Sequence, residues 1–351
     1  MLLIDIIQNN YKIISIVGMG KNAGKTVTLN HLIEEAAING ITIGITSTGR
    51  DGEGIDLVTG TEKPSIYAFE GTYIATSEKA LKLGDAKIEI IKVTDYRTPM
   101  GKIVIGKVRD AGYVQIAGPQ TTKEIKAISN ILIDFGAEVV FIDGAINRLS
   151  SAAPSVSQGC ILATGAVVSR DMNKVIRDTL HAVELFKLPE VKEDTLRILI
   201  KDIIQKENIS LIDENYNVKT LDIKTSLNSG KIISQHITKS TRYVIFPGSL
   251  VKNTIEDIVK GSRLIKNVTF VVRDGTKIFV GPVDWLRLCR QGLKVKALNS
   301  VSTLAVTINP YSPQGYYFDQ REFLNSMKKH LKDIPVFDVV HGGEYKDEIY
   351  R

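Results

Sequence analysis

A cluster of glycines followed by a lysine and a threonine stands near the start of the chain, in the stretch GMGKNAGKT at residues 18–26. Backbone N–H groups at a turn that leads into a helix can surround phosphate oxygens, and the helix dipole favours the negative charge. Gly24, Lys25 and Thr26 match the end of the phosphate-binding pattern G-x-x-x-x-G-K-[ST], whereas Met19 stands where its first glycine belongs. The stretch predicts a nucleotide site, and a plain strand–turn–helix connection is the alternative.

Each residue type in this stretch has an expected role if a nucleotide binds there. We expect Lys25 to contact the β- and γ-phosphates of ATP, or of another nucleoside triphosphate, and the Thr26 hydroxyl to ligate Mg²⁺. The surrounding backbone would hold the phosphates. The predicted cofactor-binding residues are therefore Gly20, Lys21, Asn22, Ala23, Gly24, Lys25, Thr26 and Val27.

Magnesium at such a site needs a carboxylate from a neighbouring strand, and the segment VVFIDGA supplies Asp143 after four apolar residues. Asp51 and Glu53 lie in the glycine-rich stretch STGRDGEGID, where a carboxylate can touch magnesium or orient the attacking water. The candidate catalytic residues are Lys25, Asp143 and Asp51, and the candidate metal ligands are Thr26, Asp143 and Asp51. A turn residue at Asp143 and a solvated loop around Asp51 are the alternatives.

Charge and base recognition give weaker signals. Arg50, Arg148 and Arg170 each follow a predicted strand, at the edge of a parallel sheet where ligands bind, so each is a candidate for neutralising phosphate charge. No N-K-x-D or T-K-x-D element follows a strand, which favours adenine over guanine.

The elements that must position these residues alternate between strand and helix. Apolar strands are expected at 12–17 and 138–143, and amphipathic helices at 24–39 and 121–136. Several β-rich segments with hairpin-like turns come between them. We therefore predict an α/β fold with a mostly parallel sheet and antiparallel additions. The expected domains are a nucleotide-binding domain at 1–188, a connector with a helix and weak strands at 189–240, and an α/β domain at 241–351.

Composition sets broad limits. The chain has 351 residues, 45 Lys and Arg against 39 Asp and Glu, and no block of basic residues, so nucleic acid is not indicated as a partner. Cys160 and Cys289 stand far apart without metal-ligand spacing, which fits a reducing cytoplasm. The N-terminal stretch lacks a basic region and a long apolar run, so we expect neither a signal peptide nor a membrane span.

The loop GKNAGKT resembles the loops of dimerising P-loop NTPases such as the molybdopterin-guanine dinucleotide adapter and dethiobiotin synthetase, which makes a homodimer one expectation. Members with a signature lysine carry it before the glycines; here Gly20 stands in that place and Lys21 follows. Residues 10–180 resemble the P-loop reactivase subunit of lysine 5,6-aminomutase. This likeness rests on GMGKNAGKTVTLN, TSTGRDGEGID, KPSIYAFEGTYIAT, VTDYRTPMGKIVIGKV, GYVQIAGPQTT and FIDGAINRLSSAAPSVSQGCILATGAVVSRDM.

The resemblance implies a partner-stimulated ATPase that drives exchange of damaged cobalamin from an adenosylcobalamin-dependent aminomutase, beside a partner ATPase subunit. The residues alone leave two other classes open, an ATP-dependent small-molecule ligase or kinase and a regulatory nucleotide binder with little hydrolysis. The cobalt-ligating pattern D-x-H-x-x-G is missing, because DVVHGG at 338–343 has its histidine at another spacing.

Overall fold

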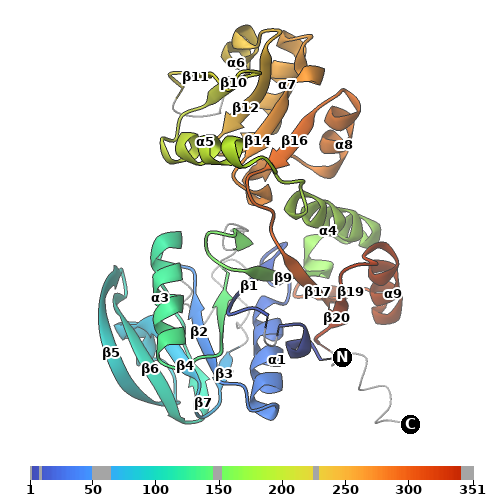
Figure 1. Ribbon diagram of the computed structural model, residues 1–351. Coiled ribbons are helices and arrows are strands. Elements are labelled where there is room, and N and C mark those ends of the chain that lie inside the picture. Colours follow the sequence, from blue (N-terminus) through green and yellow to red (C-terminus); the bar gives the residue numbers. More distant parts are fainter. Residues whose placement is uncertain (1, 8–9, 50–64, 145–151, 224–228, 341–351) are drawn as a thin grey trace. The chain divides into compact units, whose positions relative to one another are not determined.

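The computed structural model describes residues 2–7, 10–49, 65–144, 152–223 and 229–340. Two compact units divide the chain: unit 1 comprises Met1–Thr179 and Ser302–Arg351, and unit 2 comprises Leu180–Val301. Both units combine helices with β-sheets, so the predicted α/β class is confirmed (Figure 1).

The two units differ from the domains that we expected. Residues 189–240, the expected connector, supply helices and strands of unit 2, and residues 302–351 return to unit 1. Strand pairing is the reason, because β17 (Thr303–Asn309) lies parallel to β9 (Gly159–Gly165), with Val306 opposite Leu162. A local sequence pattern carries no sign of pairing between strands so far apart in the chain.

Within the described ranges, unit 1 contains a nine-stranded sheet in the order β20-β17-β9-β1-β8-β2-β4-β6-β5. All neighbours are parallel except β4–β6 and β5–β6, so the predicted mostly parallel sheet with antiparallel additions is confirmed. The remaining strands of this sheet are β1 (Ile13–Gly18), β2 (Ile43–Ser47), β4 (Tyr73–Ser77), β5 (Lys87–Thr98), β6 (Gly101–Asp110), β8 (Val139–Asp143) and β20 (Val336–Asp338).

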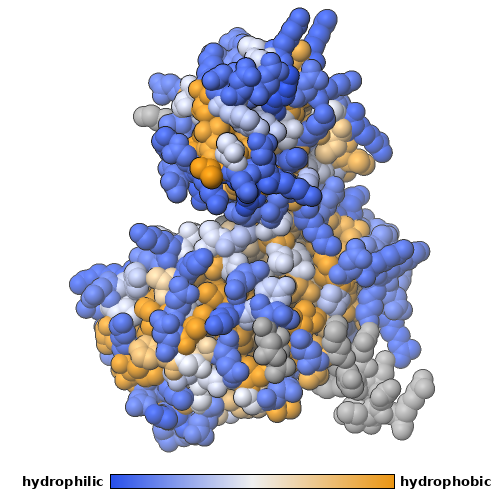
Figure 2. All heavy atoms as spheres, viewed as in Figure 1, coloured by the Kyte–Doolittle hydropathy of each residue, from blue (hydrophilic) through white to orange (hydrophobic). Residues whose placement is uncertain are grey.

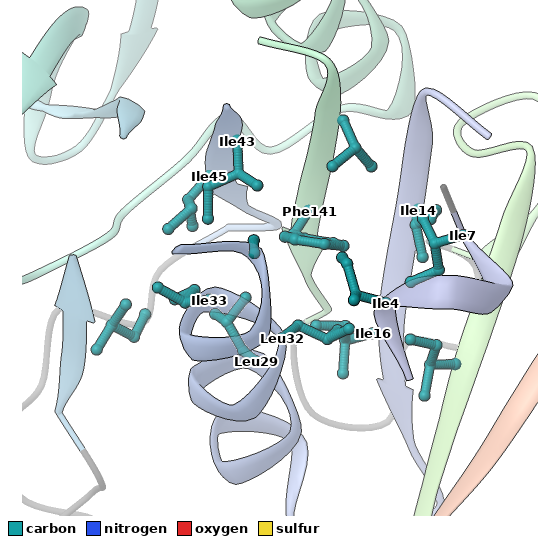
Figure 3. Close-up of a cluster of buried hydrophobic side chains, with 14 of the residues drawn as sticks. Ile4, Ile7, Ile14, Ile16, Leu29, Leu32, Ile33, Ile43, Ile45 and Phe141 are labelled. Atoms are coloured by element: carbon teal, nitrogen blue, oxygen red, sulfur yellow. The ribbon is translucent and has the colours of Figure 1, made fainter. Parts of the chain in front are cut away.

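Helices cover both faces of the central strands, which is why these strands are apolar runs without alternation. Leu32 of α1 (Lys25–Ile38) belongs to the same buried cluster as Phe141 of β8 (Figure 3). Val140 packs instead with α3 (Thr122–Asp134) in a second cluster. Successive residues of a strand point to opposite faces, so α1 and α3 lie on opposite faces of the sheet.

Local signals set the ends of α3. The Thr121 side chain accepts a hydrogen bond from the Glu124 amide at 3.2 Å, and a Glu124 carboxylate oxygen accepts one from the Thr121 amide at 3.3 Å. This capping box satisfies N–H groups that a helix start leaves open. Gly136 follows the helix with φ of 113°, so the predicted start and stop of this helix are confirmed.

Shorter elements complete unit 1, and one helix continues into unit 2. They are η1 (Ile4–Ile6), β3 (Ile66–Ala68), α2 (Glu78–Leu81), β7 (Gly112–Val114), η3 (Ala166–Val168), α4 (Met172–Phe186), β18 (Tyr311–Ser312), β19 (Tyr316–Tyr317) and α9 (Gln320–His330). The unit boundary at residues 179 and 180 falls inside α4. No helix in the described part of the chain is both long and apolar enough to cross a membrane.

Unit 2 is built on a sheet with the strand order β11-β10-β12-β14-β16. Strands β12, β14 and β16 are parallel, and β10 and β11 are antiparallel additions. The core side chains of α6, α7 and α8 share one cluster with Phe270, whereas those of α5 pack with Val271 on the other face. The elements are α5 (Asp194–Gln205), β10 (Ser210–Asp213), β11 (Val218–Thr220), α6 (Gly230–His236), β12 (Thr241–Phe246), β13 (Leu250–Val251), α7 (Lys252–Gly261), η4 (Ile265–Asn267), β14 (Thr269–Val272), η5 (Gly275–Lys277), β15 (Ile278–Phe279), α8 (Pro282–Arg290) and β16 (Lys294–Ala297).

A buried carboxylate holds the N-terminal segment against α1. Glu35 is 7% exposed and accepts hydrogen bonds from the amides of Leu3 at 3.3 Å and Ile4 at 2.8 Å, and its Oε1 lies 3.0 Å from Nε2 of His31. Burial alone would raise the pKa of Glu35, but the hydrogen bonds from His31 and the Ile4 amide outweigh it and lower the pKa below its ordinary value.

We expect Glu35→Ala to lower the free energy of unfolding of unit 1 by about 1–3 kcal/mol at pH 7, because two buried amides lose their acceptor. The lowered pKa means that the stabilisation is present above about pH 4.3, the ordinary pKa of glutamate, and is lost as the pH falls through the lowered pKa. Hydrogen exchange in α1 at several pH values measures the difference. Glu34→Ala, at an exposed neighbour, is the control, and an equal effect of the two variants would contradict the prediction.

Candidate functional site

The chain turns from β1 into α1 through residues 18–24, which we call the glycine loop. Gly24 precedes α1 with φ of 102°, and Asn22 has φ of 59°. Two residues with left-handed backbone conformations bend this short loop sharply. At Gly24 the positive φ costs little, because glycine has no side chain. The Met19 amide donates a hydrogen bond to the Ala163 carbonyl at 2.9 Å, which ties the loop to β9.

Lys25 is the first residue of α1, and its side chain folds back over the glycine loop. Its Nζ donates a hydrogen bond to the Gly20 carbonyl at 3.4 Å, and only 9% of the residue is exposed. A Cβ on Gly18 would lie 3.0 Å from Cγ of Lys25, so the absence of a side chain at Gly18 leaves room for the lysine stem. The ammonium is thus placed to contact an anion that binds on the loop.

The start of α1 favours a negative ligand. Its first turn, which contains Thr26 and Val27, has no acidic residue, so the positive end of the helix dipole has no carboxylate of its own helix beside it. The hydroxyls of Thr28 and Thr307 share a hydrogen bond of 2.8 Å, which fixes the beginning of the helix against β17. The start of α1 is thus held against a strand, which suits an anion site.

Gly24 lies against a residue that the sequence analysis did not predict. A Cβ on Gly24 would come within 3.2 Å of Cβ of Asn309, the last residue of β17. The Asn309 side chain accepts a hydrogen bond from the Tyr311 amide at 3.0 Å. Gly24 therefore meets two requirements, a positive φ and a close approach to a neighbouring strand end.

Asp143 ends β8 beside the loop-bearing strand. Its register partners are Ile16 of β1 and Ser47 of β2, and it is 8% exposed. Val139 and Phe141 of β8 pack on the α1 side, so alternation places the Asp143 side chain on that side too. The structure thus brings a carboxylate to the same sheet edge and face as Lys25.

The stretch after β2 begins next to Asp143. The Thr48 amide donates to the Asp143 carbonyl and the Gly49 amide to the Pro119 carbonyl, both at 2.9 Å. The other residues predicted for this region, Asp51, Glu53, Arg50 and Arg148, lie outside the described residues.

Arg170 follows β9 and η3 at the same edge of the sheet as the glycine loop. Its guanidinium lies 5.1 Å from the ring centre of Tyr316, whose hydroxyl donates to the Ala166 carbonyl at 2.9 Å. This contact fixes Arg170 against the turn after β17. Tyr316 and Asn309 were missed because their only signal is a turn that follows a strand assigned to another domain.

The topology agrees with a ligand at this edge. After β1 the chain continues to β2, on one side of β1 in the sheet, whereas after β9 it continues to β17, on the opposite side. The direction in which strands are added to the sheet therefore reverses between the neighbours β1 and β9. Open α/β sheets bind ligands beyond the carboxyl ends of the strands at such a reversal. The glycine loop lies there.

These residues fit a phosphate-bearing ligand with magnesium. A small-residue loop before a helix suits the phosphates, Lys25 carries a positive charge, and Thr26 and Asp143 are residues that could supply oxygen ligands. Among the described residues no group of three or more His, Cys, Asp or Glu side chains could hold a metal. Magnesium bound to a nucleotide does not need such a group, because water and phosphate complete its shell.

The cysteines add no chemistry to this site. Cys160 is buried in β9, and burial raises the pKa of its thiol to about 12, so the thiolate needed for nucleophilic attack does not form near neutral pH. Burial also raises the pKa of Cys289, at the end of α8 in unit 2.

Comparisons with known proteins give no match. No family model, no curated protein and no solved structure matches the chain.

We expect Gly24→Ala to destabilise the start of α1 more than Gly40→Ala does. Both positions have positive φ, but a Cβ at Gly40 meets nothing within 4 Å, whereas one at Gly24 also meets Asn309. Backbone strain alone costs about 1 kcal/mol for each. Hydrogen exchange of the α1 amides measures the difference. Equal effects of the two variants would show that the close approach to Asn309 adds no cost in stability.

Proposed function

We propose that the glycine loop is a P-loop, that unit 1 has a P-loop NTPase-type fold, and that this unit binds a nucleoside triphosphate with Mg²⁺. The observation that carries the proposal is the placement of Lys25 over the loop between Gly18 and Gly24, with Asp143 on the adjacent strand end and on the same face. ATP is the nucleotide to test first, because the sequence has no N-K-x-D or T-K-x-D element after a strand.

Each residue has a defined task in this proposal. Lys25 exchanges its hydrogen bond to the Gly20 carbonyl for the β- and γ-phosphates, and the amides of residues 20–26 bind phosphate oxygens. Thr26 and Asp143 orient the metal, directly or through water. The bound triphosphate would supply the phosphoryl group, and the metal would neutralise part of its charge.

Replacement of Lys25 tests the site. Lys25→Ala removes the charge and leaves the loop backbone, so we expect nucleotide affinity to fall at least tenfold, about 1.4 kcal/mol. Isothermal titration calorimetry with ATP and Mg²⁺ measures the loss. Lys12→Ala, at an exposed residue just before β1 and at the opposite sheet edge, is the control. Unchanged affinity of Lys25→Ala for both ATP and GTP would exclude the glycine loop as the site.

We further propose that nucleotide turnover drives reactivation of an adenosylcobalamin-dependent aminomutase, by releasing damaged cobalamin, together with a partner ATPase subunit. The support is the resemblance of residues 10–180 to the reactivase subunit of lysine 5,6-aminomutase. Phosphoryl transfer needs positioned charge and a positioned water at the γ-phosphate. We therefore expect slow hydrolysis by the chain alone and faster hydrolysis with its protein partner.

Recovery of mutase activity tests this role. A mutase inactivated by turnover is mixed with ATP, Mg²⁺, fresh adenosylcobalamin, the partner ATPase and this chain, and its activity is measured over time. We expect activity to return with the natural chain and with Lys12→Ala, and to stay lost with Lys25→Ala. Equal recovery with Lys25→Ala would make the chain a nucleotide-independent scaffold. No recovery with any version would favour a small-molecule ligase or kinase, which an acceptor that stimulates ADP release would identify.

A further inference from the structure

The net positive charge of the chain comes from unit 2. Residues 180–301 contain 20 Lys and Arg against 13 Asp and Glu, whereas the rest of the chain contains 25 against 26. Within unit 2, residues 252–301 contain 10 Lys and Arg against 4 Asp and Glu. The count for the whole chain conceals this asymmetry, because unit 1 is nearly neutral.

Five of these cations gather at one edge of the unit 2 sheet. Strands β14 and β16 are parallel and begin together, with Thr269 opposite Lys294. α7 precedes β14, with η4 between them, and α8 precedes β16. A Cβ on Gly292 would lie 2.7 Å from Cγ of Lys266, so the segment after α7 touches the turn after α8. The exposed cations at this edge, which we call the basic edge, are Lys260, Arg263, Lys266, Arg290 and Lys294.

The five cations of the basic edge are not held in ion pairs among the described residues of unit 2, whereas other cations of the same helices are. Lys252 lies 2.9 Å from Asp284, and Arg287 pairs with both Asp284 and Glu256. Glu256 and Asp284 are thus engaged by Lys252 and Arg287, and among the described residues of unit 2 they form no ion pair with the basic edge.

Three exposed apolar residues precede the basic edge in the chain, and we call them the α8 stripe: Phe279, Val283 and Leu286. Val283 is 66% exposed and Leu286 is 52% exposed, and they share one helix face with Arg290 at spacings of three and four residues. Phe279, which precedes α8 in β15, is 59% exposed. Figure 2 shows hydrophobic side chains on the surface over α8, bordered by hydrophilic ones. Trp285 and Leu288 of the same helix are buried in the core, so the exposed residues are not needed for its packing.

We propose that the α8 stripe and the basic edge together form a docking surface for an acidic protein surface that also presents apolar side chains. An apolar centre with a charged border is the usual composition of a protein–protein interface, and complementary charge speeds and orients association. Single-stranded nucleic acid binds instead through several stacked aromatic rings, whereas the stripe has two aliphatic side chains and one ring. The proposal does not depend on the nucleotide site.

A synthetic helical peptide provides the test. The probe has about 20 residues, long enough to form a helix, with leucines on one face and glutamates on the other. Trp285 is the single tryptophan and adjoins Leu286, so its fluorescence in the full chain reports binding at α8. We expect saturable binding that weakens with added salt. Calorimetry on the same variants provides a readout that does not depend on the fluorescence of Trp285.

Two variants separate the apolar and charged parts of the surface. We expect Leu286→Ser to weaken peptide binding about tenfold, as for an interface anchor, and the double variant Lys266→Glu, Arg290→Glu to weaken it at least as much and to remove most of the salt dependence. The charge-matched control Lys201→Glu, Lys219→Glu changes exposed lysines of α5 and β11 and is expected to bind normally.

Three results would overturn the proposal. One is the absence of peptide binding, and another is equal binding of a scrambled peptide with the same composition or of an oligothymidylate of the same charge. The third is self-association of the chain that Leu286→Ser abolishes, because a second copy would then cover the stripe. Weakening by both the Leu286 variant and the charge-reversal variant, with normal binding by the control, supports it.

Discussion

Strand β1 is hydrogen-bonded along both edges, to β8 on one side and β9 on the other, and this pairing places the residues of the candidate site. β8 brings Asp143 level with Ile16, two residues before the glycine loop begins. β9 holds the loop through Ala163, and β17, paired with β9, brings Asn309 against Gly24. If these four parallel strands slipped in register, the carboxylate, the lysine and the glycine loop would no longer meet at one edge.

The sequence predicted the parts of this arrangement that are local. Gly24 and Lys25 are marked by a strand, a turn of small residues and a helix start that follow one another directly. Asp143 is marked by an apolar run that ends in Asp-Gly. Asn309 carries no such signal, because its place beside Gly24 depends on β17 returning to the first sheet after the whole of unit 2. The domain expectation failed for the same reason: alternating strands and helices look alike whether a segment continues one sheet or begins another.

Charge shows a similar difference between sequence and structure. The composition of the whole chain shows a small excess of basic over acidic residues. In the structure this excess belongs to unit 2, and part of it lies where α7 and α8 end. Unit 1 has little net charge and places individual charged groups, Lys25 and Asp143, at a defined edge. The two units therefore differ in how they carry charge: unit 1 places single charged groups at one sheet edge, and unit 2 spreads several exposed cations over a wider surface.

A structure of the chain with a non-hydrolysable ATP analogue and Mg²⁺ tests the central claim most directly. We predict the β- and γ-phosphates against the amides of residues 20–26, Nζ of Lys25 moved from the Gly20 carbonyl to phosphate oxygens, and the metal on the Thr26 hydroxyl within one water of Asp143. A triphosphate bound elsewhere on the chain, or a glycine loop that keeps its Lys25 contact to Gly20 at saturating nucleotide, would contradict the account.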